Sequence, residues 1–214
     1  MTPPRALYEA RFIMGGLAIL WLVFCFIVPT VSVIIALFFF YVLYFFRDPE
    51  RTAPTDPLVV VSPADGKIVA IEEIEEVEFL KRKTKRISIF LSVFDVHVNR
   101  APIAGEVTHS QPKPGKFLDA RDPDSSTLNE SRTWVILGAQ AEVVVKQITG
   151  AIARRIVPWS KVGDTLEKGE RFGMIRFGSR TELYLPLDAE TTVAIGDKVK
   201  GGETPVARLK AKTS

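Results

Sequence analysis

The feature that most limits the fold of this chain is a stretch of 35 residues, Phe12 to Phe46, that contains no Asp, Glu, Lys, Arg or His. A hydrocarbon core about 30 Å thick needs about 20 apolar residues of helix. One straight helix over the whole stretch would be about 50 Å long, which favours two passes. Proline readily ends a helix, so we predict a transmembrane helical hairpin over residues 1–46 that breaks near Pro29. One long tilted helix, or a hairpin that does not fully cross, is the alternative.

The charges beside this stretch predict its orientation. Basic residues lie on both sides of it, namely Arg5, Arg11, Arg47 and Arg51. Because cytoplasmic flanks are enriched in Lys and Arg, both ends of the hairpin are expected at the cytoplasmic face of the cell (inner) membrane. The single cysteine, Cys25, allows no disulfide within the chain and is compatible with a reducing cytoplasm.

The rest of the chain has the pattern of a β protein. A proline-rich linker, residues 47–57, precedes a region 58–214 in which short runs rich in Val, Ile and Phe alternate with Gly, Pro and Asp. This pattern predicts a mainly β fold, a compact β-sandwich or barrel-sandwich-like domain. Residues 47–214 hold 26 Lys and Arg against 24 Asp and Glu, an excess too small to indicate nucleic-acid binding.

One internal repeat points to a different class of function. The segments "VGDTLEKGE" from Val162 and "IGDKVKGGE" from Ile195 match at an offset of 33 residues. Such corners are typical of small β-sandwiches, including lipoyl and biotinyl carrier domains, so a non-enzymatic, membrane-tethered carrier is one hypothesis. A carrier displays a lysine at a hairpin tip in an "MKM"-like setting, and this sequence has no such motif.

The residues outside the hairpin offer little conventional catalytic chemistry. The only histidines are His97 and His109, which makes a metal site improbable. Ser179 lies in "RFGSRTE" and lacks the second glycine of a GxSxG hydrolase elbow. His97 follows an apolar strand and is flanked by polar residues, whereas Asp65 in "SPADGKI" reads first as a turn residue. These patterns alone indicate a membrane-tethered β domain with a polar cleft.

Four longer segments, in a fixed order, change this interpretation. Together they closely resemble the short form of phosphatidylserine decarboxylase, a pyruvoyl-dependent, self-processing membrane proenzyme. The segments are "FFRDPER" (45–51), "VSPADGKI" (61–68), "SIFLSVFDVHVNRAPIAGEV" (88–107) and "GERFGMIRFGSRTELYLP" (169–186), with "PGKF" (114–117), "NE" (129–130) and "GAIARRI" (150–156) between them. The resemblance covers residues 45–207.

The resemblance implies that the chain cuts itself between Gly178 and Ser179. The Ser179 hydroxyl would attack the Gly178 carbonyl and convert the amide into an ester. Elimination would then release the Gly178 carboxylate, and hydrolysis with loss of ammonia would leave a pyruvoyl group at position 179. The printed sequence would be the zymogen of a larger chain, 1–178, and a smaller chain, 179–214. The family's cofactor is this pyruvoyl group, with no metal.

The resemblance also implies roles for other residues. Asp65 matches the autoprocessing acid of the family, and His97 matches a histidine that serves as acid or base in decarboxylation. Longer relatives have a second histidine where this chain has Arg100, so either His97 serves both steps or Asp65 activates Ser179 directly or through water. We expect Asp65→Asn to stall self-cleavage and His97→Ala to mature at least in part.

The expected reaction converts phosphatidylserine to phosphatidylethanolamine through a Schiff base between the substrate amine and the pyruvoyl ketone, as a step of phospholipid biosynthesis. Candidate contacts for the lipid phosphate are Lys116, Arg154 and Arg155. A second substrate hypothesis is another seryl phospholipid, archaetidylserine. The expected partners are the phospholipid, the membrane and the two chains of the cut protein; homo-oligomerisation is left open.

Overall fold

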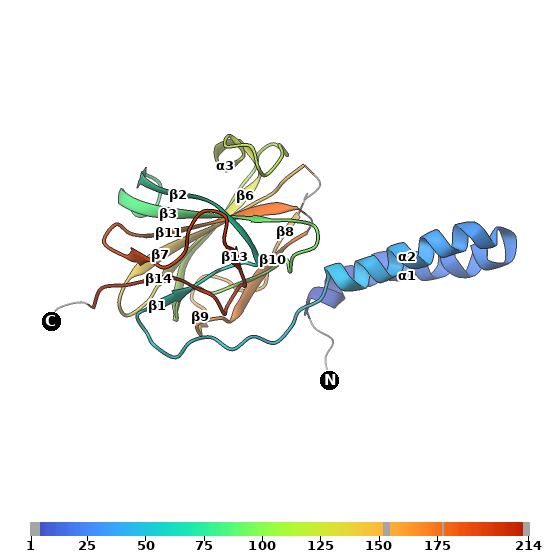
Figure 1. Cartoon of the computed structure of the whole chain (residues 1–214), viewed down its shortest axis with the longest axis horizontal. Coiled ribbons are helices and arrows are strands. Elements are labelled where there is room, and N and C mark those ends of the chain that lie inside the picture. The colour runs from blue at the N-terminus through green and yellow to red at the C-terminus, as the bar shows by residue number, and fades with distance from the viewer. Residues whose placement is uncertain (1–4, 152–154, 177, 212–214) are drawn as a thin grey trace. The chain divides into compact units, whose positions relative to one another are not determined.

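The computed structural model describes residues 5–151, 155–176 and 178–211. The chain divides into two compact units, Met1–Glu50 and Arg51–Ser214, which we describe separately. The first unit is helical, and the regular elements of the second are strands apart from one helical turn among the described residues (Figure 1).

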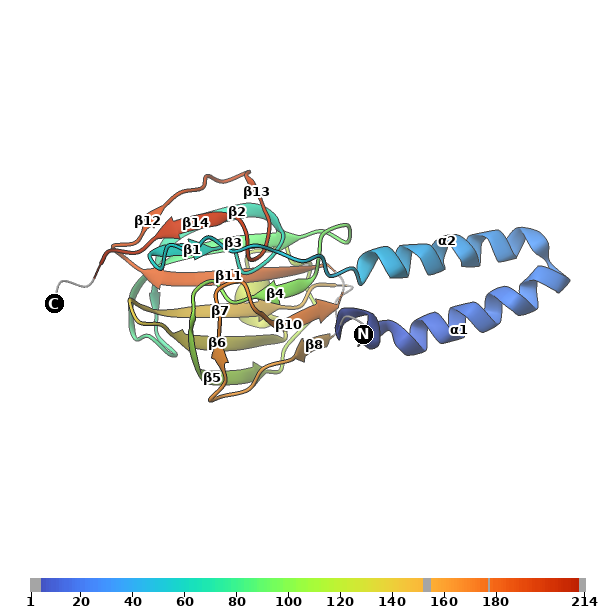
Figure 2. The same ribbon diagram turned by 90° about the horizontal axis from the view of Figure 1, so that it is seen from below.

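The first unit is a pair of antiparallel helices, α1 (Arg5–Ile27) and α2 (Pro29–Phe45), which pack side by side (Figures 1 and 2). Pro29 is the first residue of α2, where its missing N–H costs no helical hydrogen bond. The helix α1, with 23 residues, is long and apolar enough to cross a membrane, and α2 is a shorter apolar helix of 17 residues. The chain thus forms a hairpin of two apolar helices instead of one long helix, and the second helix begins at Pro29.

The second unit is mainly β, as predicted, and its only helix among the described residues is the single turn α3 (Ser125–Leu128). Its strands, in chain order, are β1 (Val59–Val61), β2 (Gly66–Glu76), β3 (Arg82–Leu91), β4 (Val98–Arg100), β5 (Gly105–Lys113), β6 (Ser131–Leu137), β7 (Glu142–Ile148), β8 (Arg155–Pro158), β9 (Thr165–Leu166), β10 (Arg171–Arg176), β11 (Ser179–Pro186), β12 (Glu190–Thr191), β13 (Lys198–Val199) and β14 (Pro205–Arg208).

These strands form three antiparallel sheets. The largest is a curled sheet with the order β13-β2-β3-β11-β7-β6-β5-β9, and the two smaller sheets have the orders β1-β14-β12 and β4-β10-β8. In Figure 1, β1 and β14 lie beneath the strands β2, β3, β11 and β7 of the large sheet. The strand β11 therefore has a neighbour on each side, β3 and β7, and lies in the interior of the large sheet.

A single hydrophobic core joins the large sheet to the smaller ones. It includes Val60 of β1, Val206 of β14 and Phe172 of β10 together with inward residues of β2, β3, β6, β7 and β11. The rings of Trp134 and Phe172 meet edge to face at 5.2 Å between centroids. Alternate residues of a strand face opposite sides of its sheet, so Leu183 of β11 faces this core while its neighbours in sequence face the other side.

The internal repeat forms the two edges of the large sheet. Each copy places a glycine at positive φ, Gly163 at 89° and Gly196 at 104°. The aspartates that follow, Asp164 and Asp197, each accept a hydrogen bond from a backbone N–H three residues earlier, at 3.0 and 2.8 Å. The short strands β9 and β13 come next and pair with β5 and β2. The repeat is thus a pair of equivalent corners that end the sheet.

Candidate active site

The Gly-Ser pair lies at the joint between two sheets. The strand β10 of a small sheet ends at Arg176, and β11 of the large sheet begins at Ser179, opposite Leu91 of β3. The Ser179 side chain is fully buried, and its Oγ has no hydrogen-bond partner among the described residues. It is two residues from Thr181 and four from Leu183, and therefore faces the core side of the sheet. A buried hydroxyl without a partner costs folding free energy of about 1 to 3 kcal/mol, and a catalytic role is one reason for a protein to retain such a group.

The carbonyl of Gly178 lies directly against Gly150. A Cβ atom on Gly150 would be 2.3 Å from the Gly178 oxygen and 3.2 Å from the Ala120 Cβ. The register of β7 with β11 explains this approach, because Ile148 pairs with Arg180, and Gly150 and Gly178 are each two positions further toward the joint. A Cβ on Gly178 itself would meet no described atom closer than 3.8 Å. The position that requires glycine for space is therefore Gly150, which sequence reasoning did not single out.

His97 is fully buried beside the strand that leads to the joint. Its carbonyl accepts a hydrogen bond from Ile175 N–H at 3.1 Å. Its Nδ1 lies 2.9 Å from the carbonyl oxygen of Asp95, which can only accept. In the neutral ring Nδ1 therefore carries the proton, and Nε2 is the nitrogen that can accept one. The Asp95 carboxylate is held by the N–H and hydroxyl of Ser92 at 2.8 and 2.6 Å, which fixes this loop.

Asn99 connects the His97 segment to the strand of Ser179. Its Nδ2 donates to Thr181 Oγ1 at 3.2 Å. His97 is two residues before Asn99, and Ser179 is two residues before Thr181. The Asn99–Thr181 hydrogen bond therefore links the segment that carries His97 to the strand that begins at Ser179.

Asp65 is separated from Ser179 by one intervening strand. Asp65 directly precedes β2, and β3 lies between β2 and β11, so the backbones of β2 and β11 are two strand spacings of about 4.8 Å apart. The carboxylate is 2.9 Å from Nη2 of Arg51 and accepts the Gly201 N–H at 2.8 Å. Arg51 also pairs with Glu203 at 2.9 Å. Arg51, which we interpreted as a cation beside the membrane, has its side chain 8% exposed and holds Asp65 instead.

Arg100, which stands where longer relatives have a second histidine, points away from the side of β4 on which Asn99 contacts Thr181. The two residues are adjacent on β4, so their side chains point to opposite sides. The Arg100 side chain is buried and donates to the Gly169 carbonyl at 3.1 Å. A Cβ on Gly202 would be 2.7 Å from its Cδ. Arg100 therefore fills the space between two turns on the other side of the strand.

The candidate phosphate contacts are only partly placed. The side chain of Lys116 is exposed, and the Lys116 backbone forms an isolated β-bridge with Asn129. The Asn129 side chain donates to the Thr149 carbonyl at 2.8 Å, which ties this segment to the residue before Gly150. Arg155 is exposed at the start of β8 and pairs with Arg176 of β10. Arg154 lies outside the described residues.

A pocket of about 250 Å³ opens beside the Gly-Ser joint. Its wall includes Gly178 and is otherwise formed by three nearby segments of the chain. The other lining residues are Phe90, Ser92, Val93, Asp119, Ala120, Arg121 and Ala151. The Arg121 guanidinium holds the pKa of Asp119 at about 2 through hydrogen bonds and charge.

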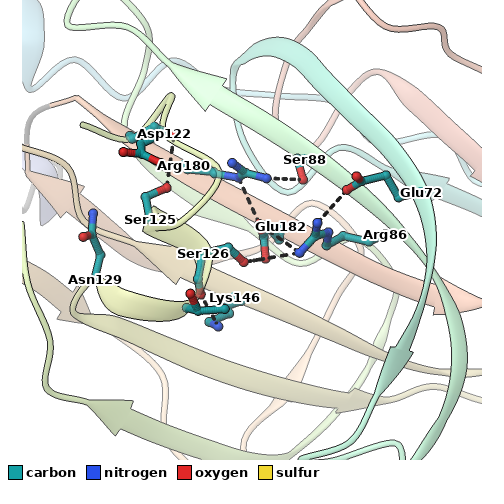
Figure 3. A network of polar contacts seen from close by, with 12 residues as sticks. Glu72, Arg86, Ser88, Asp122, Ser125, Ser126, Asn129, Lys146, Arg180 and Glu182 are labelled. Carbon is teal, nitrogen blue, oxygen red and sulfur yellow. Dashed lines mark hydrogen bonds and ion pairs between the residues drawn. The ribbon is translucent and has the colours of Figure 1, made fainter. Parts of the chain in front are cut away.

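Sequence reasoning missed a buried charged network on the other face of β11 (Figure 3). Glu182 is fully buried, lies 2.9 Å from Arg180 Nε, and accepts hydrogen bonds from the Ser126 and Tyr184 hydroxyls at 2.9 and 2.7 Å. Burial and the charge of Glu182 raise the pKa of Tyr184. The alternation of Arg, Glu and Tyr in "RTELY" was the available signal, because it places three polar side chains on one face of an interior strand.

No group of three His, Cys, Asp or Glu side chains in the described parts of the chain is arranged to hold a metal ion.

The chain is similar to known proteins over most of its length. The family model described as phosphatidylserine decarboxylase matches residues 38–207. The phosphatidylserine decarboxylase proenzyme of Symbiobacterium thermophilum is 45% identical over 210 residues, which cover 98% of each chain. That of Carboxydothermus hydrogenoformans is 43% identical over 221 residues, covering 98% of this chain and 100% of the relative. That of Desulfotalea psychrophila is 47% identical over 170 residues, 79% of each. A family match over most of its length shows that this chain belongs to the phosphatidylserine decarboxylase family.

Proposed function

We propose that this protein is a self-processing carboxy-lyase that converts phosphatidylserine to phosphatidylethanolamine, with a pyruvoyl group made from its own Ser179. The single observation that carries the proposal is the buried Ser179 hydroxyl, which lacks a hydrogen-bond partner among the described residues and directly follows the Gly178 peptide. The relatives named above are proenzymes, which supports a maturation step in this chain as well.

The surroundings of residue 179 fit a small carbonyl-bearing group. Gly150 leaves room for the Gly178 carbonyl, and Ala120 adds only a methyl group nearby. Ser179 is at the start of an interior strand, so a group formed there is held between β3 and β7. A pyruvoyl group supplies a ketone conjugated to a carbonyl, which accepts electrons from the α-carbon of a condensed amine when carbon dioxide leaves.

For self-cleavage, we assign the first proton transfer to His97. Its Nε2 is the accepting nitrogen, because Nδ1 donates to the Asp95 carbonyl, and the Asn99–Thr181 hydrogen bond links its segment to the Ser179 strand. With the Ser179 proton removed, Oγ forms a bond to the Gly178 carbon, and the C–N bond breaks as the nitrogen takes up a proton. Loss of the α-proton of residue 179 then breaks the Cβ–O bond and frees the Gly178 carboxylate. Addition of water releases ammonia.

We assign Asp65 to self-cleavage as well. We also assign His97 a second role, in decarboxylation. The loop of Asp65 is tied to the His97 segment, because the Pro63 carbonyl accepts hydrogen bonds from Asn99 Nδ2 at 3.3 Å and from Arg100 N–H at 2.9 Å. After maturation, protonated His97 would return a proton to the substrate α-carbon. This is the alternative in which one histidine serves both steps.

The substrate would enter through the pocket beside Gly178. Its wall combines apolar side chains such as Phe90 and Val93 with the charged Arg121 and Asp119. Lys116, tied through Asn129 to the residue before Gly150, and Arg155, five residues after Gly150, are the exposed cations retained as phosphate contacts. Arg154 is retained as a third phosphate contact from the sequence. Another seryl phospholipid would fit the same chemistry, because the reaction involves only the seryl head group.

We further propose that the α1–α2 hairpin anchors the enzyme in the inner membrane with its β unit on the cytoplasmic side. The hairpin has the required apolar length in α1, and Arg5, Arg11 and Arg47 flank its two ends. An anchor serves this reaction because a diacyl lipid leaves the bilayer only at a cost of about 0.8 kcal/mol per CH₂.

Mass spectrometry of the purified full-length protein tests the proposal. The wild-type chain should separate into residues 1–178 and a fragment of 36 residues that begins with a pyruvoyl group, while Ser179→Ala should stay whole and inactive on phosphatidylserine vesicles. A fragment with a free amine at position 179 in the active enzyme would refute the mechanism. A wild-type chain that stays whole would favour the carrier-like alternative.

A further inference from the structure

The side chain of Asn99 forms hydrogen bonds with both the Ser179 strand and the Asp65 loop. It is fully buried, and its side chain makes three hydrogen bonds. Nδ2 donates to Thr181 Oγ1 at 3.2 Å and to the Pro63 carbonyl at 3.3 Å, while Oδ1 accepts from Gln147 Nε2 at 2.8 Å. One amide thus joins β4, β11, β7 and the loop before β2.

The direction of these hydrogen bonds is fixed from inside the core. The indole N–H of Trp134 can only donate, and it lies 2.7 Å from Gln147 Oε1. The other end of the Gln147 amide, Nε2, must therefore point to Asn99 and donate to its oxygen. The Asn99 amide then has its two donors directed at Thr181 and Pro63. All four side chains in this chain of hydrogen bonds are fully buried, so water offers no alternative partner.

We propose that Asn99 is a positioning residue for self-cleavage, which holds the Ser179 strand and the Asp65 loop in fixed register with His97. The inference rests on the proposed function, because it concerns the rate at which the Gly178–Ser179 bond is cut. Ser179 and His97 are each two residues from a partner in the Asn99–Thr181 contact. A misplacement of about 1 Å between reacting groups can cost about 100-fold in rate.

Two substitutions remove the two hydrogen bonds donated by Asn99, to Pro63 and to Thr181, one at a time. In Asn99→Asp the side-chain shape is kept and Gln147 still has an acceptor. The Thr181 hydroxyl can turn and donate to the new carboxylate, but the Pro63 carbonyl cannot donate, so the side-chain link to the Asp65 loop is lost and only the backbone hydrogen bond from Arg100 N–H to Pro63 is left. In Thr181→Val the shape is again kept, and the link to the Ser179 strand is lost. Thr84→Val is the matched control, because Thr84 is a fully buried threonine of the same sheet that donates to the Ile74 carbonyl at 3.2 Å, near the opposite end of β3.

The measurement is the rate at which full-length precursor, purified in detergent, is converted to two chains on a gel between pH 5 and pH 8. We expect Asn99→Asp and Thr181→Val to be cut about 100-fold more slowly than wild type at pH 8. As the pH falls, the new carboxyl group gains a proton that it can donate to Pro63. The Asn99→Asp rate should then recover about tenfold relative to wild type at the same pH, while Thr181→Val should not recover.

Measuring the wild-type rate at each pH accounts for the ionisable side chains near Asn99 on its own segment and on the Asp65 loop, which are His97, Arg100 and Asp65. The strands β7 and β11 also carry Lys146, Arg180 and Glu182, which belong to the network on the other face of β11. The residues of these strands that Asn99 contacts are Gln147 and Thr181, which do not titrate in this range. Melting temperatures in a Ser179→Ala background give the stability of each variant separately from cleavage.

The inference is overturned if both variants are cut within about threefold of wild type. It is also overturned if Thr84→Val, at an equal loss of melting temperature, slows cleavage as much as Thr181→Val does, since the effect would then follow stability alone. A wild-type chain that is never cut would refute the proposed function itself, and that outcome is visible without any variant.

Discussion

The guanidinium of Arg51 lies 2.9 Å from the carboxylate of Asp65, and both side chains are largely buried. Arg51 belongs to the segment that follows the α1–α2 hairpin, whereas Asp65 directly precedes β2, the first strand of the β2–β3 hairpin. The ion pair therefore connects the linker to the Asp65 loop, which we assign to self-cleavage. A second ion pair, between Arg51 and Glu203, connects the linker to the C-terminal segment as well.

Arg51→Gln should destabilise the protein and slow its maturation. Removing one member of a buried pair leaves the other charge without compensation, which typically costs about 3 kcal/mol. Thermal unfolding and the gel assay of cleavage measure the two effects. Lys200→Gln is the control, because Lys200 is 67% exposed and lies 4.0 Å from the same Glu203. Equal effects of the two substitutions would contradict a special role for the Arg51–Asp65 pair.

Gly150→Ala should block self-cleavage. The added methyl carbon would lie 2.3 Å from the Gly178 oxygen, so the peptide to be cut must move. Gly138→Ala creates a similar crowding, 2.7 Å from the Ala104 carbonyl, but does so at the far end of the sheet. That variant should lose stability and still be cut. Efficient cleavage of Gly150→Ala on a gel would show that the approach of the two glycines is dispensable.

His97→Ala should remain uncut, because the residue that takes the Ser179 proton is then missing. General base assistance is typically worth about 10² to 10⁴ in rate, so cleavage over days would be consistent with this loss and cleavage over minutes would not. His109→Ala, a change of the only other histidine, should mature as wild type does. If His97→Ala matures readily but decarboxylates slowly, the histidine acts only in the second reaction, as the sequence first suggested.

Asp65→Asn should also remain uncut if its charge takes part in maturation. The substitution keeps the shape and the acceptor for Gly201 N–H but removes the charge that Arg51 holds. Comparison with Arg51→Gln separates the two functions of the pair, because both variants lose the ion pair and only one loses the carboxylate. Rapid cleavage of Asp65→Asn would remove Asp65 from the maturation mechanism.

Glu182→Gln should be strongly destabilising without being part of the chemistry. The buried carboxylate is 2.9 Å from Arg180 Nε, and its loss leaves a buried guanidinium without a counter-charge, at a cost of about 3 to 5 kcal/mol. Glu72→Gln removes the half-exposed partner of Arg86 in the same network and should cost less than about 1 kcal/mol. Denaturant unfolding in a Ser179→Ala background measures both. Similar losses would mean that burial of the network contributes little.

The sequence was sufficient for the elements whose signals are local. The charge-free stretch and Pro29 predicted the helical hairpin, and the alternation of apolar runs with turns predicted the β unit. The repeat predicted paired corners, which the structure places at opposite edges of one sheet. The candidate Gly178–Ser179 site came from resemblance, because a Gly-Ser pair alone is also an ordinary turn.

The remaining features depend on contacts between distant parts of the chain. Arg51 has the appearance of a membrane-flanking cation in the sequence, and only the fold brings it to Asp65. Gly150 becomes necessary because β7 is adjacent to β11, and Asn99 acquires its partners from three separate segments. Strand pairing of this kind is long-range, so no window of the sequence contains the information.

The position of β11 in the interior of the sheet has a consequence for assembly. Before the proposed cut, the chain carries β10 and β11 on one backbone, so closing the sheet is an intramolecular event with a high effective concentration. After the cut, the same strand and the three that follow it belong to a separate peptide of 36 residues. The mature protein would then be a product of folding that its own separated chains cannot readily repeat, and its lifetime would depend on the barrier to unfolding. Maturation in this sense is a one-way step for the fold as well as for the peptide bond.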